Sequence, residues 1–299
     1  AANFAADVTF ADGADIITAS AGTSNFRAGV NAGNSITSGG NYNTVVGDEA
    51  GTAITTGDDN VGVGYNSLAA NTTGIRNTAT GSLASNRNTT GGNNTSDGYQ
   101  ALYWNTTGSD NTAIGNSALT ANTTASNNTA VGKSALFANT TGAQNVAVGK
   151  DALVTNTTGS YNHAFGFQAM YQNTTGTENI GFGHNALVEN TTGSYNVALG
   201  GFALDANTTA SNNTALGYSA GSAVTTGTGH TLIGALAGDA LTTATFNTAV
   251  GYGALSADTI GNKSTAIGYA ALFNQNYTTA TDAYNTAVGF HSGVSVTTG

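Results

Sequence analysis

The chain has no cysteine and no proline, and only 7% of its 299 residues are charged. The absence of cysteine excludes a disulfide scaffold. Proline lacks a backbone donor, so its absence suits the continuous hydrogen-bond ladders of a β-sheet. Low charge without proline also argues against a disordered chain. Glycine, asparagine and threonine dominate instead, and we expect order to come from backbone pairing and the packing of small residues.

Basic residues and long apolar runs are also scarce. Six lysines and arginines stand against 16 acidic residues, which gives a net charge of −10. The basic residues are scattered singly, so no stripe exists to neutralise phosphates, and nucleic-acid binding is not expected. No apolar run approaches 18 residues, and the N-terminus shows no signal-like segment. We therefore expect no membrane insertion.

A 17-residue unit repeats along most of the chain, and its clearest copy is Asn111–Asn127. Its first asparagine defines position one. Successive copies begin at 43, 60, 77, 94, 111, 128, 145, 162, 179, 196, 213, 230, 247, 264 and 285. Only the last interval is longer, by four residues within Asn274–Tyr284, and position five is glycine in all fifteen copies. So strict a spacing predicts stacked supersecondary units.

The first five positions of the unit have the pattern of a β-strand. Position two is mostly threonine, valine or isoleucine and position four mostly valine, isoleucine, leucine or phenylalanine, whereas positions three and five are chiefly alanine and glycine. Because side chains alternate along a strand, we expect positions two and four to point into the core. The alanine and glycine face is then expected to admit another backbone at close range.

The sizes of the side chains at positions nine and twelve vary together. Position nine is usually leucine and position twelve asparagine, but glycine at nine coincides with an apolar residue at twelve, in the pairs Gly51 and Ile54, Gly221 and Val224, Gly238 and Leu241, and Gly293 and Val296. A close-packed interior requires a lost side chain to be replaced by a neighbour. This swap predicts that positions nine and twelve touch.

Asparagine recurs at two places in the unit. It occupies position one in thirteen of fifteen copies, with His230 and Ser264 as exceptions, and position twelve in nine consecutive copies from Asn71 to Asn207. Amides stacked at a fixed interval form hydrogen-bonded ladders, in which each side chain donates to the next. We expect two such ladders along the array.

The chain divides into residues 1–24, a capping segment with short strands, and residues 25–299, the repetitive array. A degenerate copy of the unit begins at Asn25. Each unit carries few bulky side chains for its length, and thin cores often need a partner chain. We therefore expect a homo-oligomer in which the alanine and glycine faces of several chains pack together.

The run Asn-Thr-Ala-Val/Ile-Gly-x-x-Ala resembles the repeat of trimeric autotransporter adhesin heads. The longer unit with Asn-Thr-Thr-Gly is similar to the repetitive shafts of bacteriophage tail fibres, which are the closer match. The resemblance covers about residues 25–299. The sequence differs from these families in two ways. Its unit of 17 residues is longer than the usual adhesin-head repeat, and we recognise no membrane-anchor barrel, coiled-coil stalk or chaperone domain in it.

The resemblance implies an all-β fold, a β-solenoid or left-handed parallel β-roll of about fifteen turns, packed as a homotrimer. It implies a structural role in a virion tail fibre involved in host attachment, with a cell-surface glycan or protein receptor. The alternatives are a bacterial surface adhesin or a self-assembling extracellular filament. A tailspike glycan hydrolase and an ice-binding solenoid are further alternatives.

No residues form a recognisable catalytic constellation, so we expect neither enzyme activity nor a cofactor. Asp48, Glu49, Asp58 and Asp59 share one unit and could hold a hard cation, although a solvated acidic edge explains them as well. Asp97 lies at position four, which is usually aliphatic, and it follows the polar residue Ser96. With His163, which is expected to point inward, it is a candidate for a polar or ion site on a symmetry axis. Local loosening or a shifted strand is the alternative for Asp97, and packing for His163.

Aromatic residues are the candidates for receptor contact. We single out Tyr103, Trp104, Tyr161, Tyr195 and Phe202, because exposed rings can stack on sugars. Aromatics recur at positions six and seventeen, so the alternative is that they stabilise one another between adjacent units. That alternative is the one we favour from the sequence.

Overall fold

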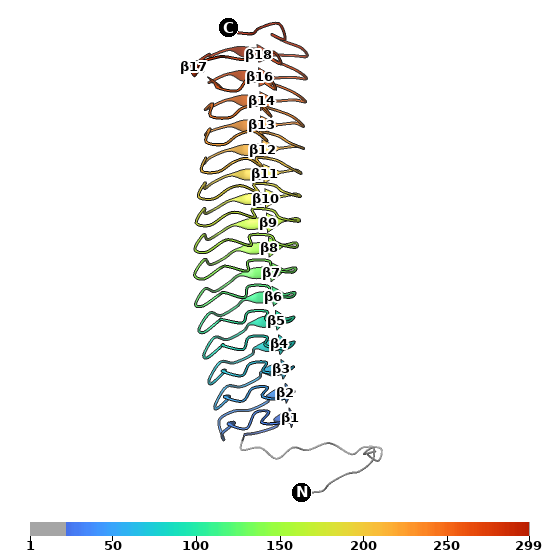
Figure 1. Ribbon diagram of the computed structural model, residues 1–299, viewed down its shortest axis with the longest axis vertical. Coiled ribbons are helices and arrows are strands. Elements are labelled where there is room, and N and C mark those ends of the chain that lie inside the picture. The colour runs from blue at the N-terminus through green and yellow to red at the C-terminus, as the bar shows by residue number, and fades with distance from the viewer. Residues whose placement is uncertain (1–21, 299) are drawn as a thin grey trace, which may run out of the picture.

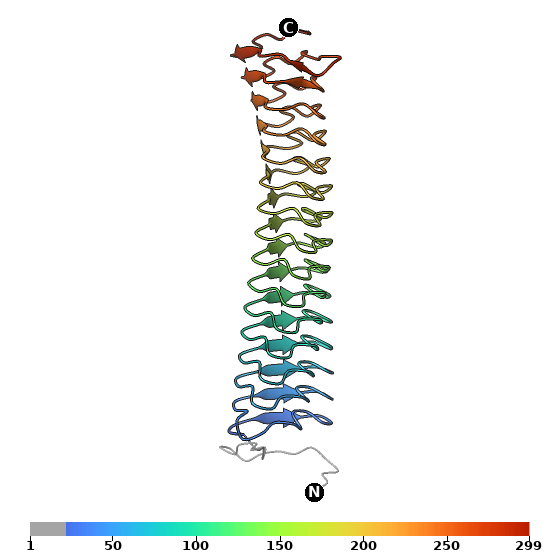
Figure 2. The same cartoon turned by 90° about the vertical axis from the view of Figure 1, so that its left-hand side faces the viewer.

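The computed structural model describes residues 22–298, which form one long rod (Figure 1). The strands expected before residue 19 lie outside the described residues. A parallel sheet of 16 strands runs the length of the rod, and each strand pairs with the strand of the next unit. Figure 2 shows these strands stacked in one column along one side, with loops on the others. The predicted all-β parallel solenoid of about fifteen turns is confirmed.

The strands occupy positions two to four of each unit. They are β1 (Phe26–Ala28), β2 (Thr44–Val46), β3 (Val61–Val63), β4 (Thr78–Thr80), β5 (Thr95–Asp97), β6 (Thr112–Ile114), β7 (Thr129–Val131), β8 (Val146–Val148), β9 (His163–Phe165), β10 (Ile180–Phe182), β11 (Val197–Leu199), β12 (Thr214–Leu216), β13 (Thr231–Ile233), β14 (Thr248–Val250), β16 (Thr265–Ile267) and β18 (Thr286–Val288). A second, two-stranded sheet pairs β15 (Gly261–Asn262) with β17 (Thr281–Asp282).

The predicted facing of the strands is wrong. In β6, Ala113 at position three is fully buried, whereas Ile114 at position four is 40% exposed. The same pattern holds from β2 to β14, where position three is always the buried one. The physical reason is that each turn is narrow and its interior is already filled from the opposite wall. Only a small side chain fits on the inner face of most strands, so the bulky ones point outward.

The core that fills each turn consists of alanine at positions three and eight and leucine at position nine. These side chains form one continuous buried cluster from Ala101 to Ala287. The contact between positions nine and twelve is confirmed. A Cβ atom added to Gly51 would lie 2.8 Å from Cδ1 of Ile54, and one added to Gly238 would lie 2.7 Å from Cδ1 of Leu241. The position-twelve side chain therefore occupies the space that leucine fills elsewhere.

Both asparagine ladders are present and buried. The Nδ2 groups of Asn60 and Asn71 both donate to the carbonyl oxygen of Gly74, at 2.9 and 3.0 Å. Asn60 Oδ1 accepts the backbone N–H of Asn77 at 3.0 Å, and Asn88 Nδ2 donates to Asn71 Oδ1 at 2.8 Å. Each ladder thus links successive turns, and the two converge on the position-fifteen carbonyl of every turn that carries both.

Three corner positions adopt a left-handed backbone in each of the fourteen units that begin at residues 43 to 264, and the first two of them do so in the unit that begins at 285. In the copy that begins at Asn111, these are Ser117 at position seven (φ 56°), Leu119 at position nine (φ 52°) and Asn127 at position seventeen (φ 63°). The sequence-based interpretation missed this feature. The chain carries a signal for it, because no valine, isoleucine or threonine occupies any of these positions, although threonine is abundant elsewhere. β-Branched side chains are the ones least compatible with positive φ.

Glycine at position five closes the strand and contacts its counterpart in the next turn. Gly115 has φ +131°, and a Cβ atom there would lie 2.6 Å from the carbonyl oxygen of Gly132. The close approach predicted for these glycines exists, but it joins turns of one chain. The alanine and glycine faces are buried within one chain, so they cannot pack against another chain as we expected.

The four extra residues near the C-terminal end leave the main sheet intact. Thr265 of β16 still pairs with Thr286 of β18, so the insertion bulges outward and forms β17. Position one of this unit is Ser264, and Gln275 at position twelve donates to its hydroxyl at 2.9 Å and to buried Asp258 at 2.7 Å. The longer Gln275 side chain compensates for the shorter Ser264.

The column of position-five glycines generates a first prediction. In Gly115→Ala, the new methyl group meets the Gly132 backbone and forces an L-residue into a region that is nearly exclusive to glycine. We expect the free energy of unfolding to fall by about 3 kcal/mol or more. Gly201→Ala is the matched control, because its Cβ would have no neighbour closer than 3.8 Å. Equal midpoints of denaturant unfolding for the two variants would contradict the assigned role.

The ladders generate a second prediction. Asn156→Ala removes the donor to Asn139 Oδ1 and the acceptor for Asn173 Nδ2, both inside the core. Buried groups left without a partner cost about 1–3 kcal/mol each, so we expect a loss of about 3 kcal/mol in chemical denaturation. Asn116→Ala, on an exposed corner, should change stability by less than about 0.5 kcal/mol.

Candidate functional site on the outer face of the sheet

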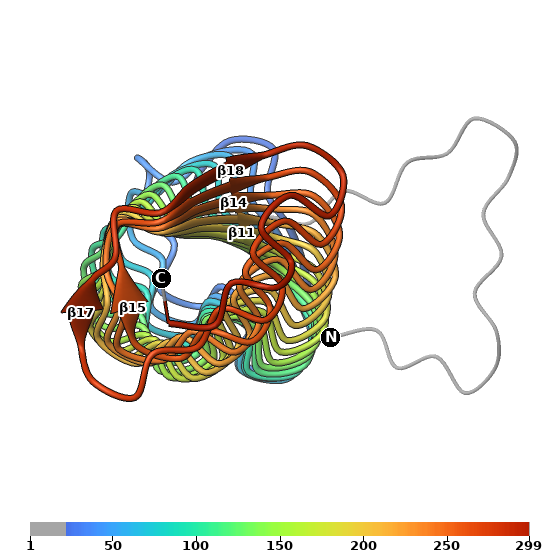
Figure 3. The same cartoon turned by 90° about the horizontal axis from the view of Figure 1, so that it is seen from above.

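The outer face of the sheet carries the side chains of positions two and four, which form two rows along the rod. We call the side chains at one position in successive units a row. Row four is apolar in thirteen of fifteen units, the exceptions being Thr80 and Asp97. Seven of these apolar side chains are exposed, for example Phe182 at 52% and Leu216 at 42%, and the other six are half-buried. Seen along the axis, this face is one flat side of the rod (Figure 3). An apolar row of this length on a surface is a candidate interaction site.

Row six, at the corner after the strand, contains a ladder of side chains that contact one another from turn to turn, with their rings tilted or edge to face. Lys150 Nζ lies 5.1 Å from the centre of the Phe167 ring, which lies 5.7 Å from His184. Phe202 continues the ladder from position seven, with its ring centre 4.8 Å from His184 and 6.0 Å from Tyr218. Phe202, a predicted receptor contact, therefore packs between neighbours of its own chain.

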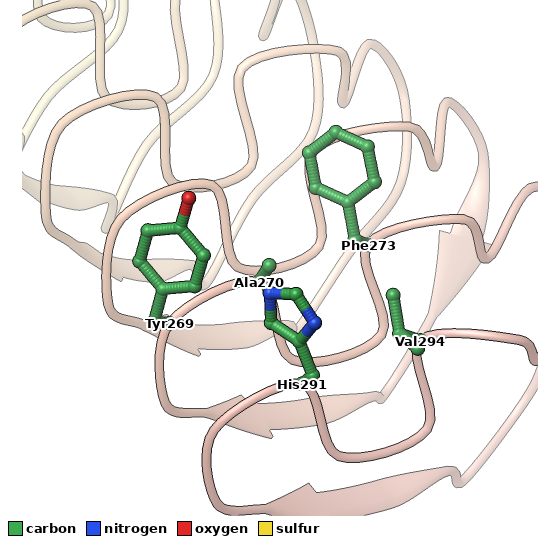
Figure 4. A pocket seen from close by; sticks show the side chains of 5 residues that line it. All are labelled: Tyr269, Ala270, Phe273, His291 and Val294. Atoms are coloured by element: carbon green, nitrogen blue, oxygen red, sulfur yellow. The ribbon is translucent and has the colours of Figure 1, made fainter.

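A second ladder lies at the C-terminal end of the same row. Tyr252 stacks on Tyr269 at 5.5 Å, Tyr269 stacks on Phe290 at 5.1 Å, and Phe290 stacks on His291 at 4.3 Å. A cavity of about 220 Å³ beside it is lined by Tyr269, Ala270, Phe273, His291 and Val294. In Figure 4 the His291 ring lies between those of Tyr269 and Phe273. The aromatic rings beside this cavity contact one another, so they stabilise adjacent turns as the ladder interpretation expects.

A larger cavity of about 420 Å³ lies where β9 and β10 begin, and is lined by Tyr161, His163, Glu178 and Ile180. His163 and Ile180 are register partners at position two of adjacent strands. Tyr161 and Glu178 are the position-seventeen residues that precede them, both with a left-handed backbone. The cavity therefore spans two neighbouring turns and combines a phenol, an imidazole, a carboxylate and an aliphatic side chain.

The structure brings together residues that the sequence had placed in separate hypotheses. Tyr161 was a candidate receptor contact and His163 a candidate for an axial site, and both line this cavity. Tyr195 lies one turn further along row seventeen and is 54% exposed. The expectation that His163 points inward is wrong, because position two faces outward and His163 is exposed. Glu178 was missed, although its place between two tyrosines at 17-residue spacing is visible in the sequence.

Asp97 is exposed on the outer face, and its strand is not shifted. Thr80 and Ile114 are its register partners on the two adjacent strands. Inside the turn, Ser96 and Ser85 form a buried hydroxyl pair at 2.9 Å, which replaces the usual alanine and leucine. Asp97 and His163 belong to units four apart, so one chain does not bring them together.

The four acidic residues of the unit beginning at 43 lie at two different corners. Asp48 and Glu49 follow β2, whereas Asp58 and Asp59 precede β3. Asp48 Oδ1 accepts the backbone N–H of Val30 at 3.0 Å, and Asp58 Oδ1 accepts that of Asn41 at 2.7 Å. Both carboxylates therefore link turns of the solenoid. Among residues 22–298, no group of three or more histidine, cysteine or acidic side chains is placed to hold a metal ion.

Tyr103 and Trp104 lie on a loop at positions ten and eleven, away from the strand face. Their rings pack edge to face with centres 5.1 Å apart. The Arg87 guanidinium lies 4.8 Å from the centre of the Trp104 ring, one turn away. Trp104 remains 47% exposed, but it is already in contact with a cation of its own chain.

His230 takes the place of an asparagine in the position-one ladder, and its side chain has a strongly shifted pKa. Its Nε2 donates to the carbonyl oxygen of Ala244 at 2.8 Å, and its Nδ1 accepts the backbone N–H of Asn247 at 3.2 Å. The ring thus takes over two bonds of the asparagine it replaces, in its neutral form. Burial lowers the pKa of His230 to about 4.

Two other sites have shifted pKa values. Burial is the main reason why the pKa of Asp205 is raised. At the insertion, the hydrogen bond between Lys263 and Asp282 raises the pKa of the lysine and lowers that of the aspartate. That 2.6 Å ion pair is solvent-exposed, so its contribution to stability is small.

Comparison with protein-family models and with curated protein sequences finds no match for this chain. Within the described part of the chain, no helix has the length and hydrophobicity needed to cross a bilayer.

The buried imidazole generates a third prediction. Its folded pKa of about 4 lies below the unfolded value of 6.5, so between these pH values only the unfolded chain gains a proton. The stability from neutral His230 is complete above pH 6.5 and declines as the pH falls toward 4, by roughly 3 kcal/mol in total. His230→Asn restores the ladder residue and should remove this part of the pH dependence. Parallel stability curves for wild type and variant from pH 7 to 4 would contradict the assignment.

Proposed function

We propose that this chain is a rigid shaft segment of an attachment fibre, of the kind found in virion tail fibres, that acts without catalysis. The observation that carries the proposal is the unbroken sheet of 16 strands with constant register. At a strand spacing of about 4.8 Å, these strands span about 70 Å. A rod whose turns are joined by two internal amide ladders resists bending and compression, which suits a spacer that holds a binding site away from a surface.

We further propose that the shaft is a homotrimer whose chains pack through row four. The alanine and glycine faces cannot serve, because they are buried within each chain. Row four offers an uninterrupted apolar stripe from Ile114 to Val288. Burying that stripe around a symmetry axis would remove it from water without distorting any turn. A bacterial surface adhesin or extracellular filament built on the same rod would use the same contact.

The enzyme alternative has less support. Glycoside hydrolysis uses two carboxyl groups about 5–10 Å apart across the scissile bond. The cavity beside β9 and β10 is lined by one carboxylate, that of Glu178.

The ice-binding alternative also has less support. It would require two outward hydroxyl rows, and position fourteen does supply one row of exposed threonines. At position sixteen, however, hydroxyls such as that of Ser109 accept a backbone N–H of the neighbouring turn, here from Gly92 at 3.1 Å.

The fourth prediction concerns assembly. Light scattering on the purified chain should give about three times 29.5 kDa, and electron microscopy should show straight rods. Leu216→Asp places a carboxylate in the middle of row four and should shift the mass toward one chain, because three like charges would meet in an apolar contact. Thr107→Asp, exposed on the loop side at position fourteen, is the control and should stay trimeric. A wild-type mass of a single chain would refute the trimer, and compact particles would refute the rod.

A further inference from the structure

The cavity beside β9 and β10 differs from the rest of the outer face in its composition. Row seventeen has polar side chains in most units before residue 161, then the consecutive series Tyr161, Glu178 and Tyr195. Row two changes in the units that begin at 162 and 179, from threonine or valine to His163 and Ile180, and returns to valine at Val197. The local sequence therefore departs from the repeat in two adjacent rows at once.

From this arrangement we propose that Tyr161, His163, Glu178 and Ile180 form a binding site for an uncharged hexopyranose residue of a glycan, bordered by Tyr195. The proposal builds on the attachment role and names the class of ligand for it. The site needs only the fold of a single chain.

The three row-seventeen side chains leave the backbone in the same geometry. Their φ angles are 59°, 56° and 61°, and each backbone N–H donates at 3.1 Å to a carbonyl oxygen of the preceding turn. They are consequently held one strand spacing apart, about 4.8 Å, on a rigid corner. A site built on fixed backbone has little ordering cost when it binds.

The tyrosines of row seventeen are free of the ring contacts that occupy row six. Phe167, His184, Phe202 and Tyr218 contact one another, whereas no ring contact is found for Tyr161 or Tyr195 among the described residues. Glu178 lies between the two tyrosines and keeps them apart in the row. Tyr161 is 52% exposed, which leaves its ring open to a sugar. Mutual stabilisation therefore accounts for row six and leaves these two tyrosines unexplained.

The polar groups of the cavity match the chemistry of a sugar. An aromatic ring packs against the C–H face of a pyranose, and a carboxylate can accept hydrogen bonds from two adjacent hydroxyl groups. His163 supplies a further polar partner, and Ile180 an apolar wall. The carboxylate and imidazole make no side-chain hydrogen bond within residues 22–298, so they are available to a ligand.

The local charge selects against acidic sugars. Glu178 is the charged residue that lines the cavity, and no lysine or arginine occurs between Lys150 and Lys263. A sialic or uronic acid would bring a second carboxylate close to Glu178 without a compensating cation. Row seventeen lies before the strand and row four at its end, so a trimer contact centred on row four leaves this corner open.

The fifth prediction tests the site on the intact chain with lactose, maltose, mannobiose and cellobiose, and with 3′-sialyllactose as the acidic probe. We expect at least one uncharged disaccharide to bind, as measured by calorimetry and by saturation-transfer NMR, and 3′-sialyllactose to bind more weakly than lactose. Tyr161→Ala and Glu178→Gln should each weaken binding at least tenfold. Phe246→Ala is the matched control, because Phe246 is a 60% exposed row-seventeen aromatic between Gly229 and Lys263, and it should bind like wild type.

Three outcomes would overturn the proposal: no binding of any uncharged saccharide, binding that survives both substitutions, or a preference for the sialylated sugar. Each variant is checked by electron microscopy and thermal unfolding, so that a lost fold is not mistaken for a lost site. A chain that forms trimeric rods without binding sugar would refute the site alone. A monomeric chain that binds sugar would refute the trimer and leave the site standing.

Discussion

The fold depends on the satisfaction of amide groups inside a narrow turn. A loop of 17 residues that closes on itself has several corners, and corner backbone groups cannot all pair with the neighbouring turns. The carbonyl at position fifteen is such a group, and it receives two donors, as Gly108 does from Asn94 and Asn105. The same asparagines bond to the next turn, so one set of side chains closes each turn and joins it to the next. Leucine, alanine and glycine then fill only the space that the amides leave.

The end of a ladder shows what this arrangement requires. Asn207 is the last asparagine of the position-twelve ladder, because the next unit has Val224 there, and its Oδ1 is buried without a partner. In that unit Gly221 lies at position nine, and the side chains of Leu232, Leu204 and Val224 together fill the volume of the missing leucine. The unit thus exchanges a hydrogen-bonded amide for an apolar contact, and the unpaired oxygen remains on the preceding turn. The core of this turn stays filled after the change, but the hydrogen-bonded ladder at position twelve ends at Asn207.

Much of this architecture could be predicted from the sequence, because stacking makes chemical demands that recur at a fixed interval. The unit length, the two ladders and the contact between positions nine and twelve follow from residues such as Asn111, Asn122 and Gly238. Which face of the strand points into the core could not be predicted in this way. Alternation separates Ile114 from Ala113 but does not say which one is inside, and the rule that bulky side chains point inward fails when Leu119 already fills the turn.

The proposed sugar site was only partly predictable for a related reason. Tyr161, Tyr195 and His163 were recognisable as departures from the repeat, but their grouping depends on which rows adjoin. Rows seventeen and two lie side by side only because the left-handed residue at position seventeen turns the chain directly into the strand. The same geometry accounts for Glu178, whose carboxylate lies between the two tyrosine positions.

The left-handed corner also explains why recognition can develop in row seventeen without harm to the rod. Positive φ at this position disfavours β-branched side chains but places no other demand on the residue, because the side chain points away from the core. Asparagine, arginine, tyrosine and glutamate all occur there, as at Asn127, Arg76, Tyr161 and Glu178. Position five is always glycine, and positions one and twelve vary only where neighbouring residues compensate, since their atoms complete the ladders or contact the next turn. The division between fixed interior positions and variable corner positions lets one repeat carry different surface chemistry at chosen heights along a rod whose shape does not change.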